Sequence, residues 1–220
     1  MSKITLFIPL LSALLVGCSD GKSETKVAVK PESAPAVDPE VEYFSLHALC
    51  ESPDATPEQV QEFLDLGVNV NEKNGHFGRT PLMQASMSSP DPKVIQLLVG
   101  AGADVIERDS LGFTPLHYAV QYNQEPGITV SLLRAGSRVN AITYTGQSPL
   151  LFSINRNDGG EVCKLLIAAG ADLTEKDEVH GTSILHAAIQ KKAPINLIET
   201  LITEGANLRA LDNDKRSPLH

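Results

Sequence analysis

Apolar residues between positions 44 and 220 recur in two short patterns that alternate at a constant interval. The first pattern, in most copies, is a hydroxyl residue followed by proline and leucine, and the second is an apolar pair followed shortly by glycine. Copies of the first pattern lie 34 to 36 residues apart and begin at Phe44, Thr80, Thr114, Ser148, Ser183 and Ser217. Copies of the second end at Gly67, Gly102, Gly136, Gly170 and Gly205. Two patterns in one phase predict a repeated structural unit.

Each unit is predicted to contain two helices. Thr80, Thr114 and Ser148 can accept hydrogen bonds from the free N–H groups of a helix start, and each is followed by proline, whose missing N–H costs nothing there. Residues 56–59 have a capping-box sequence at the start of a second helix. Asp91 precedes proline in the same way. The recurring glycines follow the second helices, where a left-handed residue ends a helix.

Helices of eight to ten residues, as expected here, are only marginally stable in isolation. They must therefore pack against the helices of neighbouring units, so that a continuous core grows along the stack. We expect a set of leucines to be buried between units, namely Leu82, Leu116, Leu133, Leu150 and Leu166.

The two signatures resemble the ankyrin repeat, whose unit has about 33 residues and carries the sequence T-P-L-H-x-A. The resemblance covers about 175 residues, although most inter-helix loops are one residue longer and Leu49 stands where alanine is usual. It implies an all-α solenoid of about five helix-turn-helix units joined by β-hairpin-like loops. It also implies that histidines at the fourth signature position tie neighbouring loops together through the backbone, namely His47, His117, His186 and His220.

The N-terminus has the pattern of a secretory signal peptide. A positive start at Met1 to Lys3 precedes the apolar run from Ile4 to Val16, which is too short to span a membrane as a helix. Residues 15–18, Leu-Val-Gly-Cys, resemble the lipobox of bacterial lipoproteins, which implies that Cys18 becomes the acylated first residue of the mature chain. Ser19 at the next position favours the outer membrane by the same resemblance.

Residues 19–40 contain no aromatic residue, three prolines and eight charges of both signs. Such a composition cannot bury enough apolar surface to order itself, which predicts a disordered tether. The chain thus divides into a signal peptide at 1–17, a lipid-anchored linker at 18–40 and a repeat domain at 41–220. The units cover about residues 41–74, 75–108, 109–142, 143–177 and 178–211, with a partial sixth at 212–220, so that either the sequence is truncated or residues 206–220 fray.

Charge and motifs argue against several classes of function. The formal charge of −9 falls to −10 once residues 1–17 are removed, and no cluster of basic residues with interleaved aromatics offsets it, which disfavours nucleic acid. The sequence lacks a nucleophile elbow, a zinc-binding H-E-x-x-H pair, a C-x-x-C pair and a phosphate loop. We therefore expect no catalytic residue, no metal site and no cofactor. Cys50 and Cys163 are expected to be core residues too far apart for a disulfide bond.

The resemblance places the binding surface on the hairpin tips and first helices, which line up along the concave side of such arrays. Aromatic residues on neighbouring tips are notable in a chain that is only 5% aromatic. Phe113 and Tyr144 are expected to be exposed and close together. The candidate partner-binding residues are Phe77, Arg79, Met87, Leu111, Phe113, Gln121, Tyr122, Tyr144, Asn155, Arg156, His180 and Lys191.

The sequence therefore favours a protein-protein interaction module, expected to be a monomer, that is held on the periplasmic face of the envelope by its N-terminal lipid. An immunity or inhibitor protein for a periplasmic toxin or enzyme is a special case of this function. The competing class is an enzyme or redox protein that uses Cys50, Cys163 or the histidines. The identity of the partner protein does not follow from the sequence.

Overall fold

The computed structural model describes residues 45–154, 156 and 160–220. Four predictions lie outside the described residues: the signal peptide at 1–17, lipidation of Cys18, the tether at 18–40 and the binding role of Asn155. Within the described part of the chain, no helix is both long enough and apolar enough to cross a membrane.

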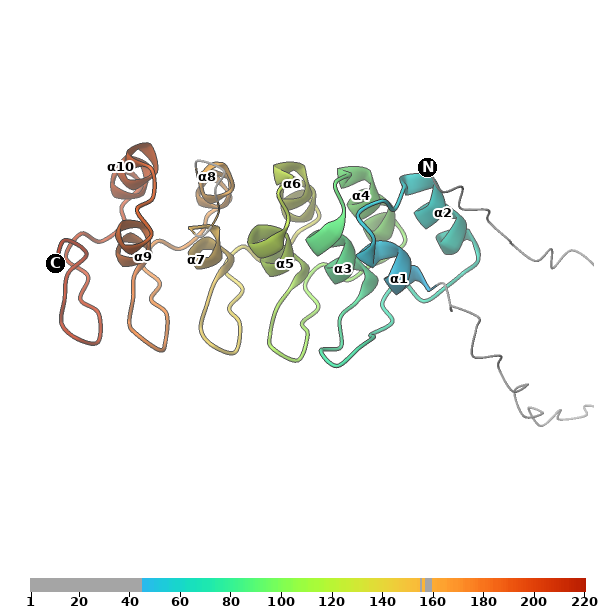
Figure 1. Cartoon of the computed structure of the whole chain (residues 1–220), viewed down its shortest axis with the longest axis horizontal. Helices are drawn as coiled ribbons and strands as arrows, with labels where there is room; N and C mark the ends of the chain where they lie inside the picture. The colour runs from blue at the N-terminus through green and yellow to red at the C-terminus, as the bar shows by residue number, and fades with distance from the viewer. Residues whose placement is uncertain (1–44, 155, 157–159) are drawn as a thin grey trace, which may run out of the picture. The chain divides into compact units, whose positions relative to one another are not determined.

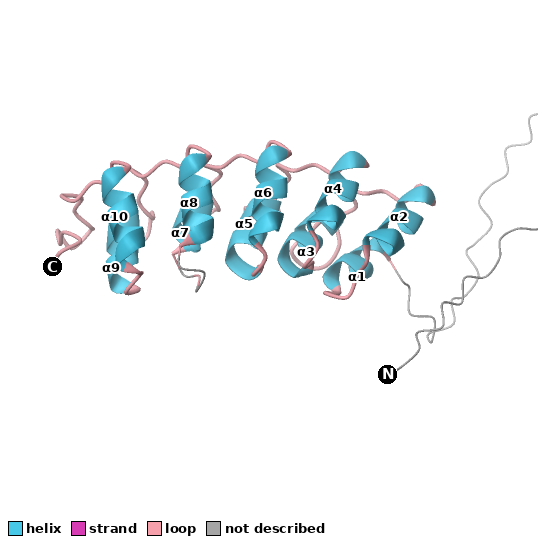
Figure 2. Ribbon diagram, turned by 90° about the horizontal axis from the view of Figure 1, so that it is seen from above, coloured by secondary structure: helices cyan, strands magenta, loops and turns pink. Residues whose placement is uncertain are grey.

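Ten short helices in the described residues form five consecutive pairs, which confirms the all-α prediction. The first helices of the pairs are α1 (Leu46–Glu51), α3 (Pro81–Ser88), α5 (Pro115–Tyr122), α7 (Pro149–Ser153) and α9 (Ile184–Gln190). The second helices are α2 (Pro57–Asp65), α4 (Pro92–Gly100), α6 (Pro126–Arg134), α8 (Glu161–Ala168) and α10 (Ile195–Thr203). Figure 1 shows the first and second helices as two layers, with long hairpin loops extending beyond the first-helix layer. Figure 2 shows the pairs following one another in chain order along a single row.

The helix ends follow the predicted capping pattern. The side chains of Thr80 and Ser148 accept hydrogen bonds from the third backbone N–H of α3 and α7. Thr56 and Gln59 form the predicted reciprocal capping box at the start of α2. The glycines that follow the second helices all have positive φ, a conformation that only glycine adopts at little cost.

Seven of the ten helices have eight or nine residues, within the expected range, whereas α1, α7 and α9 have six, five and seven residues. In α1 the cause is Pro53, because the residue before a proline is driven out of helical geometry. Ser52 accordingly has extended backbone angles and caps α1. Helices this short depend on their neighbours, and the apolar core is continuous from α1 to α10.

The core confirms four of the five predicted leucines and corrects the fifth. Leu82, Leu116, Leu150 and Leu166 are buried, whereas Leu133 is only partly buried. The buried side chains of α6 are Ile128, Thr129 and Leu132. Since successive side chains on a helix are about 100° apart, Leu132 occupies the core-facing position and Leu133 the edge of that face.

Three histidines on first helices each connect their unit to the hairpin of the next unit, as the resemblance implied. The Nε2 atoms of His47, His117 and His186 donate to the carbonyl oxygens of Arg79, Gln147 and Arg216, over 3.2, 3.2 and 3.0 Å. The opposite nitrogen of His117 accepts a hydrogen bond from the backbone N–H of Thr114 over 3.1 Å. These rings therefore crosslink units about 30 residues apart in sequence.

Candidate binding face

The hairpins that follow the second helices form, with the first helices, the surface called here the hairpin face. Its loops comprise residues 74–79, 109–113, 143–147, 177–182 and 212–216. Figure 1 shows the first four side by side below α3, α5, α7 and α9 and the fifth beyond α9, by the C-terminal end. This is the surface on which the sequence placed the candidate binding residues.

Each hairpin is shaped by a polar side chain at its first position. The Oδ1 atom of Asp109 accepts hydrogen bonds from the backbone N–H groups of Leu111 and Phe113, both over 2.8 Å. Asp177 and Asp212 accept backbone N–H groups in the same way. Thr143 replaces aspartate in the fourth unit and accepts the N–H of Gln147 through its hydroxyl oxygen over 3.2 Å. The tips are therefore held by their own sequence.

Three of the four pairs of neighbouring hairpins are joined by a single backbone hydrogen bond. Ser110 N–H donates to the Phe77 carbonyl over 2.9 Å, and Tyr144 N–H donates to the Leu111 carbonyl over 3.1 Å. Asn213 N–H donates to the His180 carbonyl over 3.0 Å at the last hairpins. Because both the tips and the links between them are fixed, side chains on this face are displayed from an ordered backbone.

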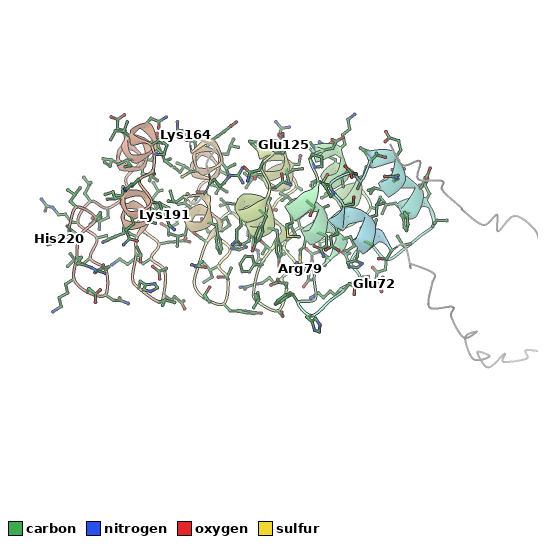
Figure 3. The ribbon with its side chains drawn as sticks, in the orientation of Figure 1. Glu72, Arg79, Glu125, Lys164, Lys191 and His220 are labelled. Carbon is green, nitrogen blue, oxygen red and sulfur yellow. The ribbon has the colours of Figure 1, made fainter. Side chains whose placement is uncertain are left out.

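Aromatic residues of the second and third units gather around an arginine. The guanidinium carbon of Arg79 lies 5.1 Å from the ring centre of Phe77 and 4.9 Å from that of Tyr118. Tyr118 stacks in turn on Tyr122, with ring centres 6.1 Å apart. Phe77 is 42% exposed and Tyr122 49% exposed. We call these four residues the aromatic patch: Phe77, Arg79, Tyr118 and Tyr122. Arg79 is labelled in Figure 3, on the loop side of the first helices.

A second arginine-aromatic pair lies on the adjacent hairpins. The guanidinium carbon of Arg108 is 5.0 Å from the ring centre of Tyr144. Arg108 also donates to the carbonyl oxygens of Gly112 and Ile142, so that its position is fixed by both hairpins. Tyr144 is 67% exposed, as expected from the sequence.

Phe113 is not exposed as the sequence predicted. Its ring is partly buried, with ring centres of Tyr118 and Phe152 each 5.4 Å away and that of His117 5.5 Å away. Phe113 stands on the returning arm of its hairpin, directly before the helix cap Thr114, and its side chain turns inward to the first helices. The prediction that Phe113 is exposed is therefore wrong, while that for Tyr144 is correct.

The other predicted residues are distributed over the same face. Met87 on α3 and Gln121 on α5 are half-buried, whereas Leu111, His180 and Lys191 are exposed. Arg156 is engaged with neighbouring backbone, since its guanidinium donates to the carbonyl oxygens of Val120, over 3.0 Å, and Asn123 at the end of α5. Arg156 therefore serves the connection between the third and fourth units.

Two polar contributors to this face were missed by the sequence reasoning, Tyr118 and Asp109. The hydroxyl group of Tyr118 donates to Oδ2 of Asp109 over 2.6 Å and accepts from Nε of Arg79 over 2.8 Å. Burial, the largest cause, and the bond to Asp109 raise the pKa of Tyr118 far above its ordinary value of 10. A tyrosine directly after the T-P-L-H signature, where the other units have glutamine, phenylalanine or alanine, was the available signal.

The nucleophilic candidates are enclosed in the core. Cys50 and Cys163 are buried and form no disulfide, and burial raises the pKa of the Cys50 thiol to about 12. A thiol in this environment is a poor nucleophile because the thiolate is the reactive form. The residues that the structure describes contain no group of three histidine, cysteine, aspartate or glutamate side chains arranged to hold a metal ion.

Comparison with known families agrees with this architecture. Residues 46–143 match the family model for ankyrin repeats, in three copies. The helix pairs continue beyond the match, through α7 to α10, with serine at the N-caps of α7 and α9 and with a further histidine link from His186. A search of curated proteins found no relative that matches the chain. Residues 46–143 thus carry ankyrin repeats, which generally mediate protein-protein interactions.

Proposed function

We propose that this chain is a lipid-anchored protein of the bacterial envelope that binds a partner protein through its hairpin face. The observation that carries the binding proposal is the row of exposed apolar side chains on four successive hairpins: Phe77, Leu111, Tyr144 and Val179. Their exposed fractions range from 42% to 67%. Side chains of this kind, gathered on one side of a soluble protein, mark interaction sites.

The rigidity of the face supports the same conclusion. The backbone carbonyl groups of Phe77 and Leu111 accept hydrogen bonds from the next hairpin, and the backbone N–H of Tyr144 donates to the preceding one. Little conformational entropy is then lost when a partner binds, so that more of the contact free energy remains as affinity. Exposed aromatic residues held in this manner are typical binding hot spots.

The anchoring proposal rests on the sequence of the N-terminus. The lipobox Leu15-Val16-Gly17-Cys18 would direct the attachment of two lipid groups to Cys18, a diacylglycerol and an N-acyl chain. Two such groups are enough for stable attachment to a membrane. With a tether at 18–40, whose typical span is roughly 25 Å for a flexible chain, the repeat domain would reach partners near the periplasmic side of the outer membrane.

Binding is tested by capture of envelope proteins on the purified chain. We expect Tyr144→Ala or Phe77→Ala to weaken capture of a specific partner by about 1–3 kcal/mol while the stability of the chain changes by about 0.5 kcal/mol or less. Leu66→Ala is the matched control, because Leu66 is 77% exposed but caps α2 in the second-helix layer. Loss of stability with unchanged capture would show that the rings only pack on their own hairpins.

Anchoring is tested separately with Cys18→Ser. This variant should remain unprocessed or become soluble, whereas the unchanged chain should partition into detergent after processing. Recovery of Cys18→Ser as a processed protein in the detergent phase would contradict lipidation at Cys18, without bearing on the binding face.

A further inference from the structure

The charge of Arg79 is positioned by its neighbours but is not neutralised by them. Its Nε atom donates to the neutral hydroxyl group of Tyr118. The carboxylate of Asp109, on the other side of the shared Tyr118 hydroxyl, is already used by that hydroxyl and by the N–H groups of Leu111 and Phe113. Among the described residues, Arg79 has no partner for its two Nη groups and makes no ion pair.

The other arginines of the hairpins are satisfied within the chain. Arg216 pairs with Asp212 over 2.9 Å and with Asp214 over 2.7 Å. Arg108 donates to two backbone carbonyls, those of Gly112 and Ile142. Arg79 differs because no group of the described residues accepts a hydrogen bond from its Nη atoms.

The surroundings of Arg79 define what that partner looks like. Phe77 and Tyr118 lie against the guanidinium, within 5.1 Å of its carbon, so that aromatic rings line the group while its Nη donors remain available. A guanidinium group with parallel N–H donors matches a carboxylate bidentately. Phe77 and Tyr122 add exposed apolar surface beside it.

The backbone of Arg79 is also fixed. Its N–H donates to the Asn74 carbonyl over 3.1 Å, and its own carbonyl accepts from Asn74 N–H over 2.9 Å and from His47 Nε2 over 3.2 Å. The arginine is thus held across its hairpin and by the first unit, which is the preorganisation expected of a specific recognition residue.

From these contacts we propose that Arg79 binds a glutamate or aspartate side chain of the partner protein, flanked in that partner by apolar residues that rest on Phe77 and Tyr122. The inference rests on the proposed function, since it names the chemistry recognised at one point of the hairpin face. Tyr118 acts as a positioning residue, because its hydroxyl group holds Arg79 Nε and keeps Asp109 from pairing with the arginine.

The test uses short peptides selected from a random phage-displayed library on the purified full chain in detergent. The tightest acidic peptide and its Glu→Gln or Asp→Asn counterpart are then compared by titration. On the unchanged chain we expect the acidic peptide to bind about tenfold more tightly, the ratio for one charge-assisted hydrogen-bonded pair. On Arg79→Gln the two peptides should bind equally.

Two further variants make the result specific. Arg134→Gln, at the exposed end of α6 in the second-helix layer, should keep the preference of the unchanged chain. Tyr118→Phe keeps the charge of Arg79 but releases its Nε, and should reduce the preference without changing the affinity for the amide peptide. Melting curves of each variant show whether the fold is retained.

The proposal is overturned if the selection yields no peptide that binds, or if the selected peptides show no preference for an acidic residue. It is also overturned if the preference survives in Arg79→Gln. Phe77→Ala distinguishes failure of the carboxylate assignment from failure of the binding face. If both peptides lose affinity on Phe77→Ala but no preference for the acid exists, the hairpin face binds partners and only the carboxylate assignment falls.

Discussion

At the scale of single residues, the same side chain often stabilises the fold and orders the hairpin face. His117 links α5 to the hairpin of the fourth unit through Nε2 and is wholly buried beside Phe113 and Phe152. Burial is the largest cause that lowers the pKa of His117, from its ordinary value of 6.5 to about 4. A protonated ring would also lose the acceptor that receives the Thr114 N–H group. The neutral ring is therefore part of the folded structure.

This burial makes stability depend on pH in a defined window. Unfolded chains take up a proton on His117 below about pH 6.5, whereas folded chains do so only near pH 4. The free energy of unfolding should therefore fall as the pH is lowered through this window, by about 3 kcal/mol in all. Urea midpoints at pH 7, 6 and 5 measure the effect. His117→Gln should flatten the dependence and His76→Gln, at an exposed position, should not; equal slopes in all three chains would contradict the assignment.

The burial difference between Leu132 and Leu133 gives a second prediction. Leu132 is fully buried, and Leu132→Ala should lower the free energy of unfolding by about 2–5 kcal/mol through lost burial and a cavity. Leu133 is only partly buried, so that Leu133→Ala should cost clearly less. Chemical denaturation of the two variants compares them directly. A larger cost at Leu133 would show that the register of α6 is shifted by one residue.

These two leucines also show what the sequence can and cannot specify. The repeat phase predicts which helix supplies a core residue, but adjacent leucines both satisfy the pattern, and only the orientation of α6 decides between them. Exposure of Phe77, Leu111, Tyr122 and Tyr144 followed from their positions in the repeat. The Arg79–Tyr118–Asp109 chain did not, because it joins residues up to 39 positions apart through side-chain directions that no local pattern encodes.

At the scale of elements, the hairpins depend on close contact between consecutive units. Gly112 has a φ of +81°, and a Cβ atom there would lie 2.8 Å from the backbone nitrogen of Tyr144. Gly136, after α6, has a φ of +92° but open space around it. Substitution of Gly136 therefore measures the cost of the backbone conformation alone, and substitution of Gly112 adds the cost of packing against the next hairpin.

Gly136→Ala should cost about 1–2 kcal/mol of stability, the usual penalty for an L-residue in the left-handed region. Gly112→Ala should cost more, because the added methyl group also forces apart the hairpins joined by the Tyr144 N–H to Leu111 carbonyl bond. Urea denaturation gives both values. If Gly112→Ala costs no more than Gly136→Ala, the hairpins are not packed as closely as the structure shows.

At the scale of the whole repeat domain, contacts run almost entirely between neighbouring units. The first helices pack in the order α1, α3, α5, α7, α9 and the second helices in the order α2, α4, α6, α8. Stability in such an array is a sum of unit and interface contributions. A change in a central unit disturbs two interfaces, whereas a change in a unit at one side of the described row disturbs one. The aromatic patch and Tyr144 lie in the second to fourth units, where the array is supported on both sides.

Hydrogen exchange can test this distribution with two equivalent core leucines. Leu132 on α6 and Leu201 on α10 are both fully buried. Leu201→Ala should accelerate amide exchange in α9 and α10 while α3 to α6 keep their protection, because the lost contacts end at the neighbouring interface. Leu132→Ala should accelerate exchange in α5 and α6 and in the helices on both sides, since it weakens the array where two interfaces meet. Uniform acceleration across the domain in both variants would mean that the repeats unfold as one cooperative unit, and that the binding face is only as stable as the weakest repeat.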